Sequence, residues 1–176
     1  MKLSSTLIGP LIAIVLLGLA SCGGQPDDGP IEVRWDRDAC QRCRMVLSDR
    51  LHSAQIRYTV PDKKRSRVKL FDDIGCAVLW LDEQDWDQQR KAAAQIWVND
   101  WRNGDWINAR TATYIKGQVT PMEYGLGAQT DTTPDGIGFE QARRHIHDIE
   151  QRFNVHGAHL KQQADQRQIT QPRTPQ

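Results

Sequence analysis

Residues 67–81, RVKLFDDIGCAVLWL, contain the junction of a predicted strand and a predicted helix. The first five residues have the β-branched, aromatic and alternating character of a strand. The apolar residues that follow recur at helical spacing and share one face of a short helix: Ile74, Ala77, Val78 and Leu81. Asp72 is its predicted N-cap, and Asp73 suits the positive end of the helix dipole.

Further strands are expected on both sides of this helix. Residues 53–60 pair with 67–71 as a hairpin around the polar turn PDKKRS, and IEVRW (31–35) alternates like a strand that leads into a cysteine-containing loop. Three later segments are predicted to be extended: 92–100, 106–115 and 125–131. From Phe139 the apolar residues again step by three and four, which predicts an amphipathic helix.

The order strand–strand–helix therefore occurs twice. We predict an α+β fold of two small related units, each a short antiparallel sheet covered by a helix, over residues 31–90 and 91–155. Residues 156–176 are rich in Gln, with little apolar surface to bury, and are predicted to be a disordered tail.

The N-terminus has the pattern of a targeting signal. Lys2 precedes an apolar run, Leu7–Ala20, which is shorter than the roughly 20 residues that a membrane-spanning helix needs. Residues 1–21 are therefore interpreted as a secretory signal peptide. LASC (19–22) resembles a bacterial lipobox, which implies a palmitate-type lipid anchor on Cys22; ordinary cleavage with a free Cys22 thiol is the alternative.

This anchor predicts a membrane lipoprotein that faces the periplasm. The residues that follow Cys22, GGQPDDGP, suit a flexible tether, so that the anchor and tether together cover 22–30. Gly23 stands where an aspartate would retain the protein at the inner membrane, so the outer membrane is favoured. Removal of Lys2 with the signal leaves acidic and basic side chains in balance, and this argues against a nucleic-acid partner.

Three cysteines remain in the mature chain: Cys40, Cys43 and Cys76. An odd number in an oxidising compartment leaves at least one thiol unpaired, so a disulfide scaffold is excluded. Two of these thiols and a thioether lie within six residues, CQRCRM (40–45), among charged and polar neighbours rather than apolar ones. This composition indicates a loop that binds or reacts with a soft, polarisable species.

Four interpretations of CQRCRM are open. A redox dithiol, a zinc site that adds Cys76 and His52, and a static Cys40–Cys43 disulfide each fit part of the pattern. The fourth is a Cu(I) site, since this soft ion prefers thiolate and thioether sulfur. Met45 and Met122, which lies in the Gly-rich segment TPMEYGLGA, both fall in predicted loops, where packing explains a methionine less well than it does in a core.

In order and spacing, these motifs resemble the NosL family of copper-binding lipoproteins, which are accessory to nitrous-oxide reductase maturation in denitrification. The resemblance spans the lipobox, the loop CQRCRM, KLFDDIGCAVLWL, IWVNDWRNGDWINARTATYI and TPMEYGLGA. It implies a metallochaperone, not an enzyme, with Cu(I) held by sulfur of Cys40, Cys43, Met45 and Met122. It also implies a fold of two ββα-type units resembling part of organomercurial lyase.

Two positions depart from the family pattern: Arg44 and Glu123 stand where glycine is usual. Only glycine reaches positive φ without cost, so a loop of different shape is expected there. Cys76, one turn into the predicted helix, is a further candidate ligand or reactive thiol, or else a small buried residue.

The resulting hypothesis is a carrier with an exposed, low-coordinate copper loop that exchanges ligands with a copper-receiving metalloenzyme or its maturation machinery. A thiol enzyme, either a disulfide oxidoreductase or similar to organomercurial lyase, is the alternative. In that alternative, Cys76 pairs with Cys40 or Cys43 and with Asp72 or Asp73.

Overall fold

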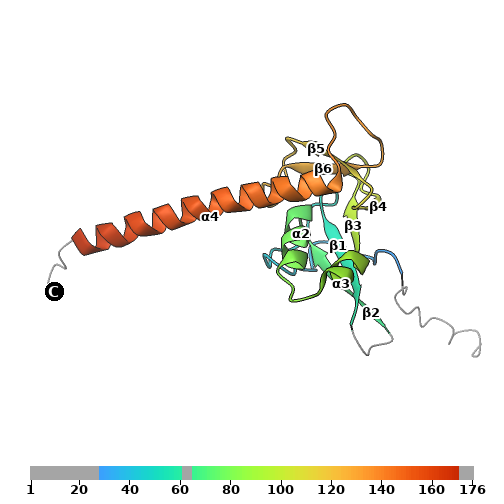
Figure 1. Ribbon diagram of the computed structural model, residues 1–176, viewed down its shortest axis with the longest axis horizontal. Helices are drawn as coiled ribbons and strands as arrows, with labels where there is room; N and C mark the ends of the chain where they lie inside the picture. Colours follow the sequence, from blue (N-terminus) through green and yellow to red (C-terminus); the bar gives the residue numbers. More distant parts are fainter. Residues whose placement is uncertain (1–27, 61–64, 171–176) are drawn as a thin grey trace, which may run out of the picture.

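The computed structural model describes residues 28–60 and 65–170. The predicted signal peptide, Cys22 and most of the tether lie outside the described residues, as does the end of the predicted tail. The elements run in the order β1 (Ala54–Thr59), β2 (Ser66–Phe71), α2 (Ile74–Asp82), α3 (Gln88–Ala93), β3 (Gln95–Asn99), β4 (Trp106–Asn108), β5 (Thr113–Lys116), β6 (Leu126–Gln129) and α4 (Phe139–Thr170) (Figure 1).

Two antiparallel sheets form the body, which confirms the predicted α+β class. The larger sheet has the strand order β2-β1-β3-β4, and the smaller one pairs β5 with β6. The β1–β2 hairpin is confirmed, with Ala54 opposite Phe71. However, β3 pairs with β1, so that Ile56 lies opposite Ile96, and strands placed in the second unit complete the sheet of the first. Since the first four residues of β1 are buried, this strand needs a neighbour along both edges.

Helix α2 packs against β1 and β2 and begins one residue later than predicted. Asp73, not Asp72, is the N-cap: its backbone is extended, and its carboxylate accepts a hydrogen bond of 2.8 Å from the N–H of Gly75. The prediction failed because either aspartate satisfies the capping preference. Tertiary contacts decide between them, since the Asp72 carboxylate accepts a hydrogen bond from Cys43 instead.

Three local predictions are wrong. The segment predicted to be extended at 106–115 is interrupted by a turn at 109–111, between β4 and β5. Residues 31–35 form no strand; the chain turns at Trp35–Arg37, with Asp36 at a φ of 60°, while Val33 is buried. Residues 92 and 93 end α3 instead of beginning a strand. This helix was missed because it is short and exposed; Asp87 caps it by accepting the N–H of Arg90 at 2.7 Å, and its Gln, Arg, Lys and Ala residues favour helix.

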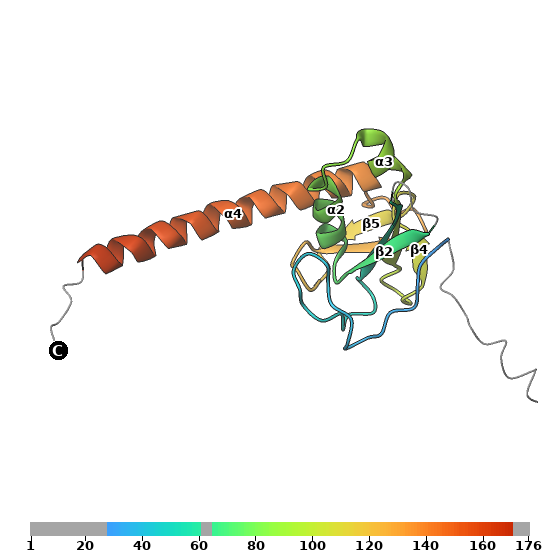
Figure 2. The same cartoon turned by 90° about the horizontal axis from the view of Figure 1, so that it is seen from below.

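Helix α4 is longer than expected. Its first turns bury Ala142 and Ile146 against the body, as the periodicity predicts, but the helix continues to Thr170, through most of the predicted disordered tail. The many Gln, Lys, Arg and Ala residues there have high helix propensity, so low hydrophobicity alone did not exclude a helix. Figures 1 and 2 show this helix extending far beyond the body.

Among the described residues, no helix combines the length and the apolar character needed to cross a membrane.

Close packing at Gly75 joins the first turn of α2 to the loop that contains Met122. A Cβ atom built on Gly75 would overlap the ring of Tyr124, which is buried. The same loop is held from its backbone, since the N–H of Met122 donates to Asp73 at 3.4 Å. The absence of a side chain at residue 75 therefore sets the approach of this loop to α2.

Gly75→Ala tests this packing by the sign of its effect. In an unobstructed helix, replacement of glycine by alanine raises the free energy of unfolding by about 1 kcal/mol. Here the overlap with Tyr124 should reverse the sign and cost roughly 1–3 kcal/mol, as overpacking does. Urea unfolding of both proteins measures the difference, and a more stable alanine variant would contradict the close approach.

Candidate metal centre

Four side chains from two segments meet in one cluster: Cys40, Cys43, Asp72 and Cys76. One ligand atom from each lies within 4.8 Å of those of the other three. Cys40 and Cys43 come from the loop CQRCRM, and Cys76 lies in the first turn of α2. Asp72 is four residues before Cys76, so the two side chains project from the same side of the helix start.

The loop is held by its own backbone and by β2. The N–H of Cys40 donates to the carbonyl of Met45 at 2.8 Å, and the N–H of Arg44 donates to the carbonyl of Cys40 at 3.1 Å. The N–H of Gln41 donates to the carbonyl of Leu70 at 2.8 Å, which fixes the loop beside the end of β2. Asp72 follows this strand directly, so the same strand end places both halves of the cluster.

Hydrogen bonds favour the thiolate form of Cys40. The Cys76 thiol is the largest influence and lowers the pKa of Cys40 to about 7, against the opposing effect of burial. The backbone N–H groups of Asp72 and Cys43 also donate to the Cys40 sulfur. Several donors aimed at one sulfur stabilise its negative charge. Cys40 is therefore the thiol best prepared to bind a cation.

The other two thiols act as donors within the cluster. Burial, together with the hydrogen bond from Cys43 Sγ to Asp72 Oδ2 at 3.0 Å, raises the pKa of Cys43 to about 12. The hydrogen bond to Cys40, and then burial, raise the pKa of Cys76 far above its ordinary value. A bound metal ion would replace these protons, because thiols ligate as thiolates.

The donor set fits a metal ion. Asp72 is 2% exposed, and its Oδ1 atom is buried without a hydrogen-bond partner among the described residues. Such an oxygen is costly unless a cation or a donor satisfies it. Three sulfurs and this carboxylate offer two to four ligands, which suits either a low-coordinate soft ion or a tetrahedral one.

Two of the open interpretations find no support in this geometry. Cys40 and Cys43 are free thiols in the structure rather than a disulfide. His52, expected as the fourth zinc ligand, is not part of the cluster, and its Nδ1 atom lies 2.8 Å from Asp49. A tetrahedral site here would take its fourth ligand from Asp72.

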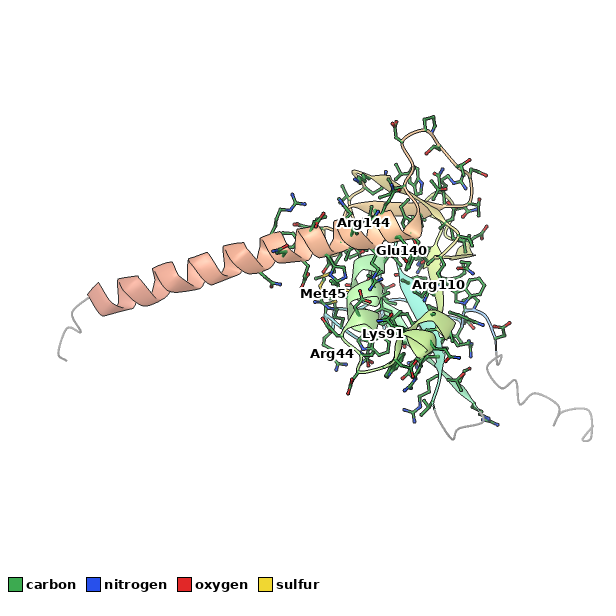
Figure 3. The ribbon with its side chains drawn as sticks, viewed as in Figure 1. Arg44, Met45, Lys91, Arg110, Glu140 and Arg144 are labelled. Carbon is green, nitrogen blue, oxygen red and sulfur yellow. The ribbon has the colours of Figure 1, made fainter. Side chains whose placement is uncertain are left out.

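The cluster is more enclosed than the exposed loop that the sequence suggested. Cys40 and Cys76 are fully buried, whereas Cys43 is partly exposed. Next to it, Met45 is 50% exposed, and Figure 3 shows Arg44 and Met45 together on the side of the body below α4. Cys43 is therefore the most accessible of the three thiols.

The two methionines lie beside the cluster in different ways. The N–H of Met45 donates to the Cys43 sulfur, while its own side chain points largely into solvent. Met122 is partly buried against the core, and its backbone is bonded to Asp73, the neighbour of Asp72. Both thioethers remain predicted ligands.

Arg44 and Glu123 keep the conformation that glycine favours. Their φ angles are 69° and 60°, in the left-handed region. Both residues therefore adopt the left-handed backbone that glycine reaches without cost, and a different loop shape stays a prediction. The surrounding hydrogen bonds hold the backbone, and the side chains bear a steric cost of roughly 1–2 kcal/mol each.

Two members of the cluster, Asp72 and Cys76, had no definite ligand role in the sequence prediction. Asp72 appeared as a helix cap or a catalytic partner, and Cys76 as one of several alternatives. The spacing of an aspartate and a cysteine four residues apart at a helix start was the available signal.

A separate cavity of about 180 Å³ lies between α2, α3 and α4, near Lys91, Arg110 and Glu140 (Figure 3), and none of the cluster residues lines it.

Arg44→Gly tests the cost of the left-handed backbone. Glycine adopts φ of 69° without steric conflict, so this variant should gain roughly 0.5–1 kcal/mol of unfolding free energy, net of the added chain entropy. Arg37→Gly is the matched control, an exposed arginine of the same segment that is not among the positive-φ residues, and it should lose a similar amount. Equal effects of the two changes in urea unfolding would contradict this account.

Comparison with known proteins places this chain in a family. Among solved structures, the crystal structure of the copper chaperone NosL from Shewanella denitrificans matches with 19% sequence identity, covering 70% of this chain and 88% of that chain at a TM-score of 0.42. No curated protein matches. The NosL family model matches residues 30–142, well over half of the chain. The chain therefore belongs to the NosL family.

Proposed function

We propose that this protein is a copper carrier that binds Cu(I) in the cluster of Cys40, Cys43, Asp72 and Cys76. The observation that carries the proposal is the convergence of three thiols, one of them with a pKa of about 7, on a buried carboxylate oxygen without a partner. Membership of the NosL family and the similarity to a protein described as a copper chaperone agree with it.

Soft-ligand chemistry favours Cu(I) over harder ions. Cysteine sulfurs outnumber carboxylates three to one in the cluster, and a d¹⁰ ion accepts two or three sulfur ligands readily. Met45 and Met122 would add thioether ligands that do not need to lose a proton. In this proposal the Asp72 carboxylate accepts a hydrogen bond from the Cys43 thiol at rest, and this proton leaves when Cys43 binds the ion as a thiolate.

The accessibility of the cluster suits transfer rather than permanent storage. Two buried sulfurs hold the ion, and the partly exposed Cys43 is the ligand that a recipient's own sulfur or imidazole would displace first. We infer a copper-receiving metalloenzyme or its maturation machinery as the partner. Nitrous-oxide reductase is the proposed recipient, on family grounds alone.

A Cu(I) competition titration on the purified mature protein tests the proposed ligands. Cys40→Ser, Cys43→Ser and Cys76→Ser should each weaken binding more than tenfold, over 1.4 kcal/mol, because each removes an anionic ligand. Met45→Leu and Met122→Leu nearly conserve volume, so their affinities should fall less and their folds should survive. Val46→Leu is the matched control for Met45→Leu, because Val46 is a neighbouring exposed apolar residue that offers no ligand atom.

Other results would contradict the carrier. If all three serine variants bound Cu(I) with the affinity of the wild-type protein, the cluster would be excluded as the binding site. The hydrogen bond between Cys43 and Asp72, beside two further thiols, also suits a thiol enzyme similar to organomercurial lyase. Robust turnover of an organomercurial or of disulfide substrates by the unmutated protein, lost in Cys76→Ser, would favour that alternative.

We further propose that a lipid on Cys22 anchors the protein to a membrane, where it faces the periplasm. The basis is the lipobox-like LASC after an apolar run, since Cys22 lies outside the described residues. Cys22→Ser should move the protein from the membrane pellet to the soluble periplasmic fraction, or leave it unprocessed. Ser21→Ala, an adjacent change that keeps the cysteine, should remain in the pellet. A wild-type protein found soluble with an unmodified Cys22 thiol would contradict the anchor.

A further inference from the structure

Arg42, between the two cysteines of the loop, is tied to distant parts of the chain. Its Nη2 atom donates to Glu150 Oε1 of α4 at 2.8 Å, and its Nη1 atom donates to the hydroxyl of Tyr124 at 3.4 Å. The Tyr124 hydroxyl in turn donates to Glu150 Oε2 at 2.7 Å. The three side chains therefore form a closed triangle, which joins the cysteine loop, α4 and the loop that contains Met122.

The ion pair of this triangle is largely shielded from solvent, which strengthens it. The side chains of Arg42 and Glu150 are only 22% and 24% exposed. Burial opposes the charge on Glu150, but the hydrogen bonds from Tyr124 and Arg42 outweigh it and hold the pKa of Glu150 below its ordinary value. Arg42 also contacts Glu83 at 3.3 Å, but this carboxylate is 56% exposed, so that pair is the weaker one.

We propose that Arg42 is a positioning residue: with Glu150 and Tyr124 it forms a clasp that holds the cysteine loop closed over the cluster and slows the release of bound metal. The effect on metal release rests on the proposed function. The neighbouring Gln41 anchors the loop to β2 through its backbone, so the base of the loop stays in place without the clasp. Loss of the clasp then frees the outer part of the loop, which carries Cys43.

Glu150 is the informative position because it lies on α4, and its hydrogen bonds go to Arg42 and Tyr124 rather than to the cluster. Glu150→Gln keeps the size of the side chain and removes its charge, while Glu140→Gln makes the same change near the start of the same helix, outside the clasp. In the protein loaded with Cu(I), transfer to a chromogenic Cu(I) chelator should be about tenfold faster for Arg42→Gln and Glu150→Gln. It should be unchanged for Glu140→Gln.

A double-variant cycle separates the clasp from a general loss of stability. If Arg42 and Glu150 act through each other, Arg42→Gln/Glu150→Gln should release copper no faster than either single variant, since contacting residues are not additive. Independent destabilisation would instead multiply the two rates. Multiplied rates, or release at the wild-type rate in Glu150→Gln, would overturn the clasp.

A measurement without metal keeps this result distinct from the proposed function. In the metal-free protein, alkylation of Cys43 by iodoacetamide, located by mass spectrometry, should be several times faster in Glu150→Gln than in Glu140→Gln. A wild-type protein that binds no Cu(I) but shows this difference would reject the copper carrier and retain the clasp as a loop restraint. Equal alkylation in the two variants would overturn the clasp, whatever the copper result.

Discussion

The buried carboxylate of Asp73 joins the start of α2, where the candidate metal centre has Asp72 and Cys76, to the loop that contains Met122. One oxygen accepts the N–H of Gly75 and starts α2, while the other accepts the N–H of Met122 from a loop 49 positions away in the sequence. The group is fully buried, and burial raises its pKa to about 6, although hydrogen bonds from Thr120, Gly75 and Met122 favour its charged form. A carboxylate in such a position is tolerated because its oxygens are satisfied. Its neighbour Asp72 is thereby left to face the thiols.

At the start of α2, Asp72 and Cys76 face the loop that contains Cys40 and Cys43. Cys76 and Asp72 are held by a helix start and a strand end, whereas Cys40 and Cys43 are held by a six-residue loop. A site with one rigid half and one adjustable half binds an ion without large rearrangement and still allows one ligand to leave. The clasp at Arg42 bears on the adjustable half, and so does the left-handed backbone of Arg44. The strained backbone and the proposed restraint therefore both lie in the loop half of the candidate centre.

The sequence predicted those parts of the structure that depend on local pattern. Alternation in residues 53–60 and 67–71 predicted a hairpin, and helical spacing predicted α2 and the start of α4. It failed for α3, which has no buried face to produce a periodicity, and for the polar second half of α4. The concentration of sulfur in CQRCRM identified the loop of the centre, because its composition alone is unusual for a surface turn.

The sequence by itself thus determined the fold class and the concentration of soft sulfur side chains in one loop. Only the tertiary structure decided that β3 completes the first sheet, that Asp72 rather than His52 joins the thiols, and that Cys76 faces Cys40. It also decided the contact of Arg42 with Glu150, which are 108 positions apart. Hydrophobic periodicity reports which face of an element is buried, but it does not report what covers that face. The partners of a buried polar group follow from the packing of distant segments, and no local pattern specifies them.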